Sequence, residues 1–285
     1  MTPVEKALWF IEMRLGQETS LSDIARISGV SPFHLSHAFG AATGQSVMRY
    51  RRARRLTEAA RALAGGAADI LAIALDAGYA SHEAFTRAFR DQFAHTPEAV
   101  RARRHIDNIP MMEPIRMDKT LIVELEPPRF ETGKMLLIAG LGERYRFETN
   151  EGIPTQWQRF IPHLGSILGQ VGTTTYGVCH NGDDDGSFEY VTGVEVAGFA
   201  DIAAGFSRVR IPERRYAVFS HRGHVSGIRA TVYSIWNDWL PKSGHKVADA
   251  PNFERYGTEF DGRSGNGTVE IWVPLQTEQS WTNSR

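Results

Sequence analysis

Through the first part of the chain, apolar residues recur every three or four positions, which is the spacing of amphipathic helices. A first helix is expected over residues 3–16, and a capping-box-like start at Ser20 opens a second. Gly29 then supplies a tight connection to a third helix, which begins at Ser31 and Pro32. This order of helix, turn and helix predicts a helix-turn-helix unit.

The same pattern occurs a second time about fifty residues later in the chain. The matching positions are Ile24, Ala25, Gly29, Leu35, Ala38 and Phe39 in the first copy, and Ile73, Ala74, Gly78, Phe85, Ala88 and Phe89 in the second. Two helix-turn-helix units in one chain favour sequence-specific DNA binding without obligatory dimerisation. Monomeric binding is therefore expected, and the chain holds no heptad repeat of useful length. The alternative is an additional dimer formed through the β-rich half of the chain.

A long helix is expected between the two units, over about residues 46–63, with one apolar face and arginines mostly on the other. After the second unit, residues 97–104 predict a closing helix. Residues 108–118 contain Pro110 and Pro114 with little periodicity, which is typical of a linker.

Beyond the linker the pattern changes to short β-rich segments. Strands are expected at 121–125, 134–141, 188–196, 205–211, 215–221 and 268–273, and helices at about 152–168 and 225–240. The order strand, helix and two strands occurs twice. The predicted fold is multidomain: an all-α N-terminal domain with two helix-turn-helix motifs, followed by an α+β domain.

The composition is compatible with this division, since 285 residues with 42% hydrophobic positions suffice for two globular domains. A single cysteine, Cys179, excludes an intrachain disulfide. The sequence shows neither a signal-peptide pattern nor an apolar run of the ~20 residues that a membrane span needs. We therefore expect a cytoplasmic protein without membrane contact.

Charge is distributed unevenly although the net charge is only −1. Divided near Asn108, the N-terminal part carries +3 and the remainder −4. Residues 49–55 hold a cluster of arginines that could contact DNA phosphates, together with one arginine further on. These candidates are Arg49, Arg51, Arg52, Arg54, Arg55 and Arg90. The alternative is an ordinary solvated helix face.

Residues 4–105 resemble the DNA-binding domain of the AraC/XylS family. The resemblance rests on the stretches at 23–39, 50–56, 73–79 and 81–97, which read DIARISGVSPFHLSHAF, YRRARRL, IALDAGY and SHEAFTRAFRDQFAHTP. It implies two recognition helices, at residues 32–39 and 81–89, that enter successive major-groove segments about one turn, ~34 Å, apart.

The resemblance also implies which side chains face the bases. These are Phe33, Ser36, His37, His82, Glu83, Thr86 and Arg87. Arg87 is the strongest candidate, because a guanidinium can donate two bonds to guanine O6 and N7, worth roughly 1 to 3 kcal/mol. His37 occupies the equivalent place in the first unit. Glu83 either accepts from cytosine N4 or serves as a favourable charge at a helix N-terminus.

From about residue 120 to 276 the chain resembles the GyrI-like effector-binding domain, the module that follows a similar DNA-binding domain in Rob-like regulators. The matching stretches are residues 216–223, 236–244, 251–256 and 270–275. The resemblance implies two related strand-helix-strand-strand units around a cavity. The expected divisions are 1–108 for DNA binding, 109–118 for the linker, 119–278 for the effector-binding domain and 279–285 for a tail.

An aromatic and acidic set in this domain suits a small apolar or cationic ligand, because rings attract cations and a carboxylate supplies the counter-charge. The candidates are Trp236, Trp239, Glu254, Tyr256 and Glu270. For the two tryptophans the alternative is packing in the core. No catalytic residue, metal site or cofactor is expected.

The sequence therefore predicts a transcription regulator that is not an enzyme and whose partners are double-stranded DNA, RNA polymerase and a small-molecule effector. Two alternatives stay open. The first is a GyrI-like hydrolase in which Glu254 or Glu270 is the general base. The second is a C-terminal protein-interaction module.

Overall fold

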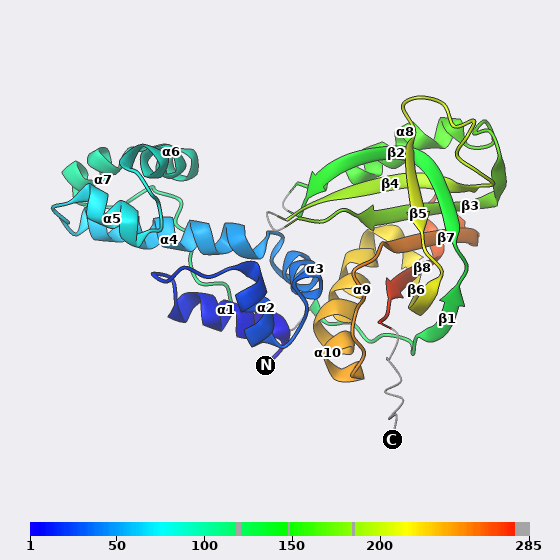
Figure 1. Cartoon of the computed structure of the whole chain (residues 1–285), viewed down its shortest axis with the longest axis horizontal. Coiled ribbons are helices and arrows are strands. Elements are labelled where there is room, and N and C mark those ends of the chain that lie inside the picture. Colours follow the sequence, from blue (N-terminus) through cyan, green and yellow to red (C-terminus); the bar gives the residue numbers. More distant parts are fainter. Residues whose placement is uncertain (118–120, 148, 184–185, 277–285) are drawn as a thin grey trace, which may run out of the picture.

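The computed structural model describes residues 1–117, 121–147, 149–183 and 186–276. Figure 1 shows helices at the N-terminal end and a curved sheet with its own helices in the rest of the chain. The expected tail, the last residue of the expected linker (118) and the first two residues of the expected effector-binding domain (119–120) lie outside the described residues.

The first unit consists of α1 (Pro3–Met13), α2 (Leu21–Ser28) and α3 (Pro32–Thr43). The expected capping box is confirmed: the Ser20 hydroxyl accepts from the backbone N–H of Asp23, and the Asp23 carboxylate accepts from the N–H of Ser20. Gly29 ends α2 with φ 77°, a left-handed conformation that glycine adopts without a steric penalty. The local signals in the sequence therefore fix the first helix-turn-helix.

Helix α4 (Val47–Ala64) leads to the second unit, which consists of α5 (Ile70–Asp76), α6 (His82–Phe93) and α7 (Pro97–Arg103). At 1.5 Å per residue, the 18 residues of α4 span about 27 Å. The second unit has its own core, in which Phe85, Phe89 and Phe93 pack against α4 residues such as Leu56. Both expected units and the long helix between them are confirmed.

The effector domain, residues 121–276, is built on an antiparallel sheet in the order β1-β6-β8-β7-β3-β4-β2-β5. The strands are β1 (Arg129–Gly133), β2 (Leu136–Arg146), β3 (Gln170–His180), β4 (Ser187–Val196), β5 (Ser207–Ile211), β6 (Arg214–His224), β7 (Asn252–Asp261) and β8 (Asn266–Pro274). The helices are α8 (Ile153–Phe160), α9 (Ile228–Ser234), a π turn (Ile235–Trp239) and α10 (Leu240–Ser243). The two expected strand-helix-strand-strand units are β2-α8-β3-β4 and β6-α9-β7-β8, and they join where β3 pairs with β7.

One expected strand is wrong, and some of the observed strands were not expected. Residues 121–125 form no regular strand, and the Val123 N–H instead donates to the Ser234 hydroxyl at 2.9 Å. Strands β1, β3 and β7 were not predicted, because glycine, threonine and charged residues interrupt their apolar alternation. Pairing between the two units, rather than local propensity, determines β3 and β7.

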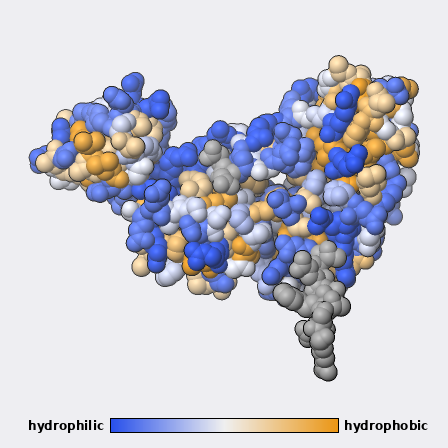
Figure 2. Space-filling view, viewed as in Figure 1, coloured by the Kyte–Doolittle hydropathy of each residue, from blue (hydrophilic) through white to orange (hydrophobic). Residues whose placement is uncertain are grey.

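The first unit packs directly on the effector domain, whereas the second unit projects away from it (Figures 1 and 2). Leu35 and Phe39 of α3 share one hydrophobic cluster with Phe219, Trp236 and Ile271 of the effector domain. Helix α3 lies beside α9 and the π turn that follows it. The two halves of the DNA-binding domain therefore have different surroundings.

Candidate DNA-reading surface and effector site

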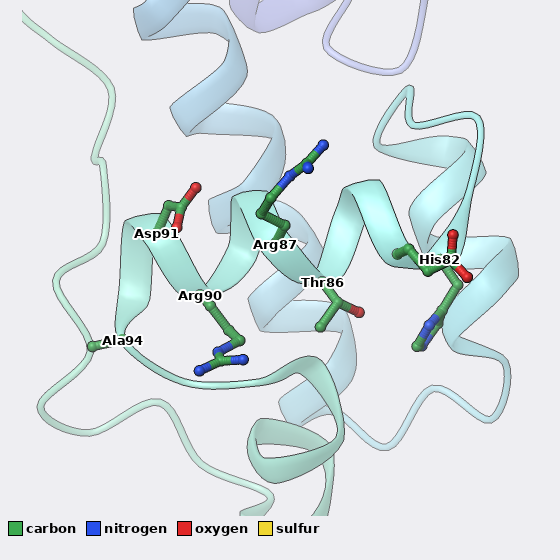
Figure 3. Close-up of a pocket in the computed structure, with 7 residues that line it drawn as sticks. His82, Thr86, Arg87, Arg90, Asp91 and Ala94 are labelled. Atoms are coloured by element: carbon green, nitrogen blue, oxygen red, sulfur yellow. The ribbon is translucent and has the colours of Figure 1, made fainter.

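Helix α6 carries an open polar face. Its side chains line a shallow groove of about 620 Å³, in which Arg87 and Arg90 point in different directions (Figure 3). Both arginines are exposed. The Thr86 hydroxyl is buried and has no hydrogen-bond partner within the described residues. The exposure of Arg87 suits the base-reading role expected for it, whereas the Thr86 hydroxyl would have to turn outward to contact a base.

The two residues at the start of α6 have local interactions. His82 Nε2 lies 3.0 Å from Glu98 Oε1 of α7. Glu83 is exposed in the first turn, where the helix dipole favours a carboxylate. The dipole accounts for Glu83 without a contact to cytosine, although the residue also lines the groove.

The corresponding face of α3 is covered by the effector domain. The His37 ring stacks on Trp236, with ring centroids 4.9 Å apart, and Phe33 lies edge-on to the same indole at 6.3 Å. None of the residues 33–43 is exposed. The expectation that Phe33 and His37 face outward is therefore wrong for this conformation, whereas Ser36 is half-buried. The reason is that α3 carries no charged residue to keep this face in water.

Two arginines expected to contact phosphate are buried instead. Arg54 is only 3% exposed; its Nη2 lies 2.8 Å from Glu12 Oε2, and its Nη1 donates to the Met112 carbonyl at 2.8 Å. Arg51 donates to the Gln17 carbonyl. These side chains join α4 to α1, to the segment after α1 and to the linker, so their expected contact with phosphate is wrong.

The other arginines of the cluster differ from these two. Arg49 and Arg52 are exposed on α4, as is Arg90 on α6. Arg55 is half-buried over Gly78, and its Nη2 donates to the Asp76 carbonyl at 3.2 Å. Phosphate contact by the three exposed arginines stays a prediction, whereas Arg55 connects α4 to the turn of the second unit.

In the effector domain, Glu254 of β7 is the centre of a polar and aromatic cluster, here called the effector site. Its Oε2 accepts from the hydroxyls of Tyr190 and Tyr256, each at 2.8 Å. Trp157 of α8 donates from Nε1 to the Tyr190 hydroxyl at 3.1 Å and packs edge-on against Tyr256 at 4.8 Å. Gly177 of β3 makes room for this cluster, because a Cβ there would collide with the Tyr190 hydroxyl.

The electrostatics of the effector site are unusual. Burial raises the pKa of Glu254 even though the hydroxyls of Tyr256 and Tyr190 hydrogen bond to its carboxylate and oppose the shift. Burial, together with the charge of Glu254, also raises the pKa of both tyrosines well above the usual value. In the described part of the chain, no lysine or arginine forms an ion pair with Glu254. The carboxylate therefore lacks a lysine or arginine counter-charge within these residues, and the charge of His221 only partly offsets the effect of burial on its pKa.

Glu270, the second acidic candidate, lies on the other face of the sheet. It pairs in register with Arg255, and neighbouring residues of a strand point to opposite faces, so Glu270 and Glu254 are separated. Glu270 contacts Arg129 at 2.7 Å and Arg255 at 3.0 Å. Burial acts to raise the pKa of Glu270, but the hydrogen bonds from Arg129, Arg255 and Trp272, together with the charge of Arg255, lower it. Its charge is thus already compensated, beside a polar depression of about 420 Å³.

The structure does not bring the two candidate tryptophans to the effector site. Trp236 packs on α3, and Trp239 packs edge-on against Phe219 at 4.8 Å. Packing in the core, the alternative expectation, describes both. Tyr190 was missed by the sequence reasoning; its only signal is its place in an alternating strand.

Family models match both parts of the chain. The model for the GyrI-like small molecule binding domain matches residues 126–276, and a helix-turn-helix domain model matches residues 24–103. The regulatory protein SoxS of Escherichia coli (strain K12) is 35% identical over 100 residues, which cover 35% of this chain and 94% of SoxS. The chain belongs to the GyrI-like family and to the AraC/XylS family.

Similarity also extends over the full length of this GyrI-like regulator. The Right origin-binding protein of Escherichia coli (strain K12) is 25% identical over 289 residues, which cover 96% of this chain and 98% of that protein. The solved structure of SAV2435 bound to tetraphenylphosphonium is 23% identical and covers 53% of this chain and 94% of its own, with a TM-score of 0.44.

Membership of the two families establishes the general function. The protein is a DNA-binding transcription regulator of the AraC type that carries a GyrI-like small-molecule binding domain. Within the described residues, no helix is both long enough and apolar enough to span a membrane.

Proposed function

We propose that the effector domain of this regulator binds a lipophilic aromatic cation at Glu254, and that binding changes transcription at the sites that the chain reads. The observation that carries the proposal is the carboxylate of Glu254, which receives two phenol hydrogen bonds and forms no ion pair with a lysine or arginine in the described part of the chain. The chain supplies the negative charge, and the ligand supplies the positive one.

The physical argument starts from the cost of burying a carboxylate. A charged group away from water is destabilised unless it is paired, and the raised pKa of Glu254 reflects that cost. A bound cation would supply the electrostatic attraction that the Glu254 carboxylate lacks. The rings of Trp157 and Tyr256 beside the carboxylate would add cation–π attraction and apolar contact. A neutral molecule of the same shape would gain only the contact.

Calorimetry of the full chain with tetraphenylphosphonium tests this proposal, with triphenylphosphine oxide as a neutral probe of similar shape. Glu254→Gln should weaken binding of the cation by about tenfold or more, while leaving binding of the neutral probe within about twofold. Glu270→Gln, the same change on the opposite face of the sheet, is the matched control and should leave both unchanged. Equal affinity of the cation for Glu254→Gln and the unmodified chain would overturn the proposal.

The raised pKa of Glu254 provides a second readout. If part of the Glu254 population is protonated in the free protein, binding a cation must release that proton into the buffer. The apparent binding enthalpy should then change with the ionisation enthalpy of the buffer. The Glu254→Gln chain should lose this buffer dependence.

For DNA, we propose that Arg87 and Thr86 of α6 contact base edges while Arg49, Arg52 and Arg90 contact phosphates. The open groove on α6 and the exposure of these arginines support this assignment. We also propose that the regulator acts in the cytoplasm and contacts RNA polymerase on its promoters. A gel-shift experiment should show a complex of DNA, regulator and polymerase that is more stable than either binary complex.

Hydrolysis with Glu254 as the general base is a second candidate function, because a raised pKa brings a carboxyl closer to the range of a useful base. We propose that the chain is not an enzyme; the Cys179 thiol is a poor nucleophile, because burial raises its pKa and keeps it protonated. Turnover of an activated ester by the full chain, lost in Glu254→Gln, would favour the hydrolase instead.

A further inference from the structure

The two recognition helices differ in what surrounds them. Helix α6 exposes His82, Glu83, Arg87, Arg90 and Asp91, whereas α3 exposes nothing beyond Pro32. Both helices occupy the same place in their helix-turn-helix units. The difference comes from the effector domain, which packs on α3 through α9 and the π turn and leaves α6 free.

The contact on α3 is specific rather than incidental. The Asn237 side chain donates to the Ala38 carbonyl at 3.2 Å, and His34 Nε2 lies 3.3 Å from the Trp236 carbonyl. Asn237 and His34 are buried, so these hydrogen bonds satisfy the Asn237 amide nitrogen and the His34 ring nitrogen, which would otherwise lose energy away from water. The Asn237 Oδ1 has no partner within the described residues. One polar group from each surface is therefore matched across the contact.

The shapes of the two surfaces are matched as well. The ring of Phe147, from the segment after β2, occupies the space that a Cβ at Gly40 would need. Phe147 also lies edge-on to His37, at 6.0 Å between ring centroids. Beside this contact, Arg229 approaches Gly44 at the end of α3. A larger residue at position 40 could not keep the ring of Phe147 in place.

The composition of α3 suits a protein partner on this face. Between Pro32 and Thr43 the helix contains no lysine, arginine, aspartate or glutamate. Its reading face consists of rings, small residues and neutral histidines, which can be covered without burying a charge. An apolar reading face can therefore alternate between a DNA groove and the effector domain.

We propose that the effector domain and DNA compete for the same face of α3, and that the structure is the closed state of the regulator. In this state the second unit alone is open to a major groove. Opening requires the effector domain to leave α3, after which both recognition helices can engage successive segments of the duplex. Because the effector domain covers α3, it controls whether both recognition helices can read DNA.

The effector site is joined to this contact by a row of aromatic rings. Phe147 packs on Phe188 at 5.2 Å, Phe188 on Tyr145 at 6.3 Å, and Tyr145 on Tyr190 at 6.5 Å. The hydroxyl of Tyr190 is hydrogen-bonded to Glu254. A ligand that displaces Tyr190 would thus move rings that hold α3; this step rests on the proposed function.

Selection of bound sites from random duplexes tests the closed state with the full chain and without ligand. Phe147→Ala removes the ring from the effector-domain side, and Gly40→Ala displaces it from the α3 side while favouring the helix. The unmodified chain should enrich one segment, and both variants should enrich two segments about 10 base pairs apart. Gly16→Ala, where a Cβ meets open space, is the matched control and should enrich one segment.

Affinity for the two-segment site gives the quantitative result. Scrambling the segment read by α3 should weaken binding by Gly40→Ala and Phe147→Ala about tenfold, and binding by the unmodified chain less than about threefold. The same loss in all proteins, or one common motif in the selection, would overturn the proposal. Thermal melting of each variant confirms that the chain remains folded.

Repeating the selection with tetraphenylphosphonium distinguishes a failure of this proposal from a failure of the proposed function. If tetraphenylphosphonium binds and opens the chain, its addition should give the unmodified protein the two-segment preference of Gly40→Ala. If it does not bind, the proposed function fails while the behaviour of the variants still decides the closed state. If it binds without changing the motif, the aromatic row does not couple the two sites.

Discussion

The indole of Trp236 stacks on the imidazole of His37, with ring centroids 4.9 Å apart and an interplanar angle of 25°. From sequence, one of these residues was expected to bind the effector and the other to read DNA. Their contact shows that the candidate surfaces of the two domains face each other. A ligand signal could therefore reach DNA through a direct contact between the domains.

We first predict that the arginines of the open surface fall into two functional classes. Arg87→Ala should relax selectivity at one base position, with a loss of roughly 1 to 3 kcal/mol on the preferred site, because a bidentate contact to one base is removed. Arg52→Ala should weaken binding to all sequences alike, because a phosphate carries no sequence information.

Competition between specific and random duplexes measures both effects over a series of salt concentrations. For Arg52→Ala, the slope of log affinity against log salt concentration should become shallower by the equivalent of about one released counterion. An equal loss on specific and random DNA for both variants would contradict the assignment.

Arg54 lies in the same arginine cluster on α4 as Arg52, but its substitution should lower the stability of the fold rather than the affinity for DNA. Its side chain is 4% exposed and paired with Glu12, so Arg54→Ala leaves a partly buried carboxylate without its partner. Chemical denaturation should show a loss of roughly 2 to 4 kcal/mol in the free energy of unfolding. Arg49→Ala, on an exposed position of the same helix, is the control and should change stability by less than about 0.5 kcal/mol. An unchanged midpoint for Arg54→Ala would show that the ion pair contributes little.

Gly177 should be essential for the effector site. A methyl group there would lie against the Tyr190 hydroxyl and 2.8 Å from Glu254 Oε2, so Gly177→Ala must displace one of them. We expect a loss of roughly 1 to 3 kcal/mol in stability and about a tenfold loss of cation affinity. Gly257→Ala on β7, where a Cβ meets no atom within 4 Å, is the matched control. Binding by Gly177→Ala at the unmodified affinity would exclude this cluster as the ligand site.

The helical half could be predicted from the sequence because its signals are local. Ser20 and Asp23 cap α2 within three residues of each other, and Gly29 ends the same helix. The effector site could be predicted only in part. Tyr190 and Glu254 are 64 positions apart and meet because β3 lies between their strands. No hydrophobic periodicity in the sequence predicts a contact between residues so far apart.

The burial of His37 and Trp236 was beyond sequence reasoning for a related reason. A recognition helix is identified by its own turn and spacing, which do not reveal whether another domain covers it. The absence of charged residues from α3 was the available signal. It becomes informative only by comparison with α6, which keeps Glu83 and Arg87 on the equivalent face.

The contact between the domains should weaken in acid. His37 is neutral in the closed state: its Nδ1 donates to the Phe33 carbonyl at 3.0 Å, and its Nε2 accepts from Asn252 at 3.2 Å. Burial lowers the pKa of His37 to about 4, the backbone hydrogen bond to Phe33 and the charge of Asp249 oppose the shift, and the neighbouring His34 adds to it. Burial also lowers the pKa of His34.

Since the pKa of His37 is lower in the closed state than the ordinary value of 6.5, the open form takes up a proton first as the pH falls. The closed state is therefore fully stable above pH 6.5 and loses stability between pH 6.5 and about 4. From that shift, the loss contributed by His37 at pH 5 is about 2 kcal/mol. Urea titrations at pH 7 and pH 5 measure it.

His37→Gln should remove most of this pH dependence, because the glutamine side chain cannot titrate in this range. His82→Gln, on the exposed face of α6, is the matched control and should retain it. If His37→Gln and the unmodified chain lose equal stability between pH 7 and pH 5, the titration belongs to other groups. An acid-sensitive contact at His37 would also make the two-segment DNA preference appear at low pH without any ligand.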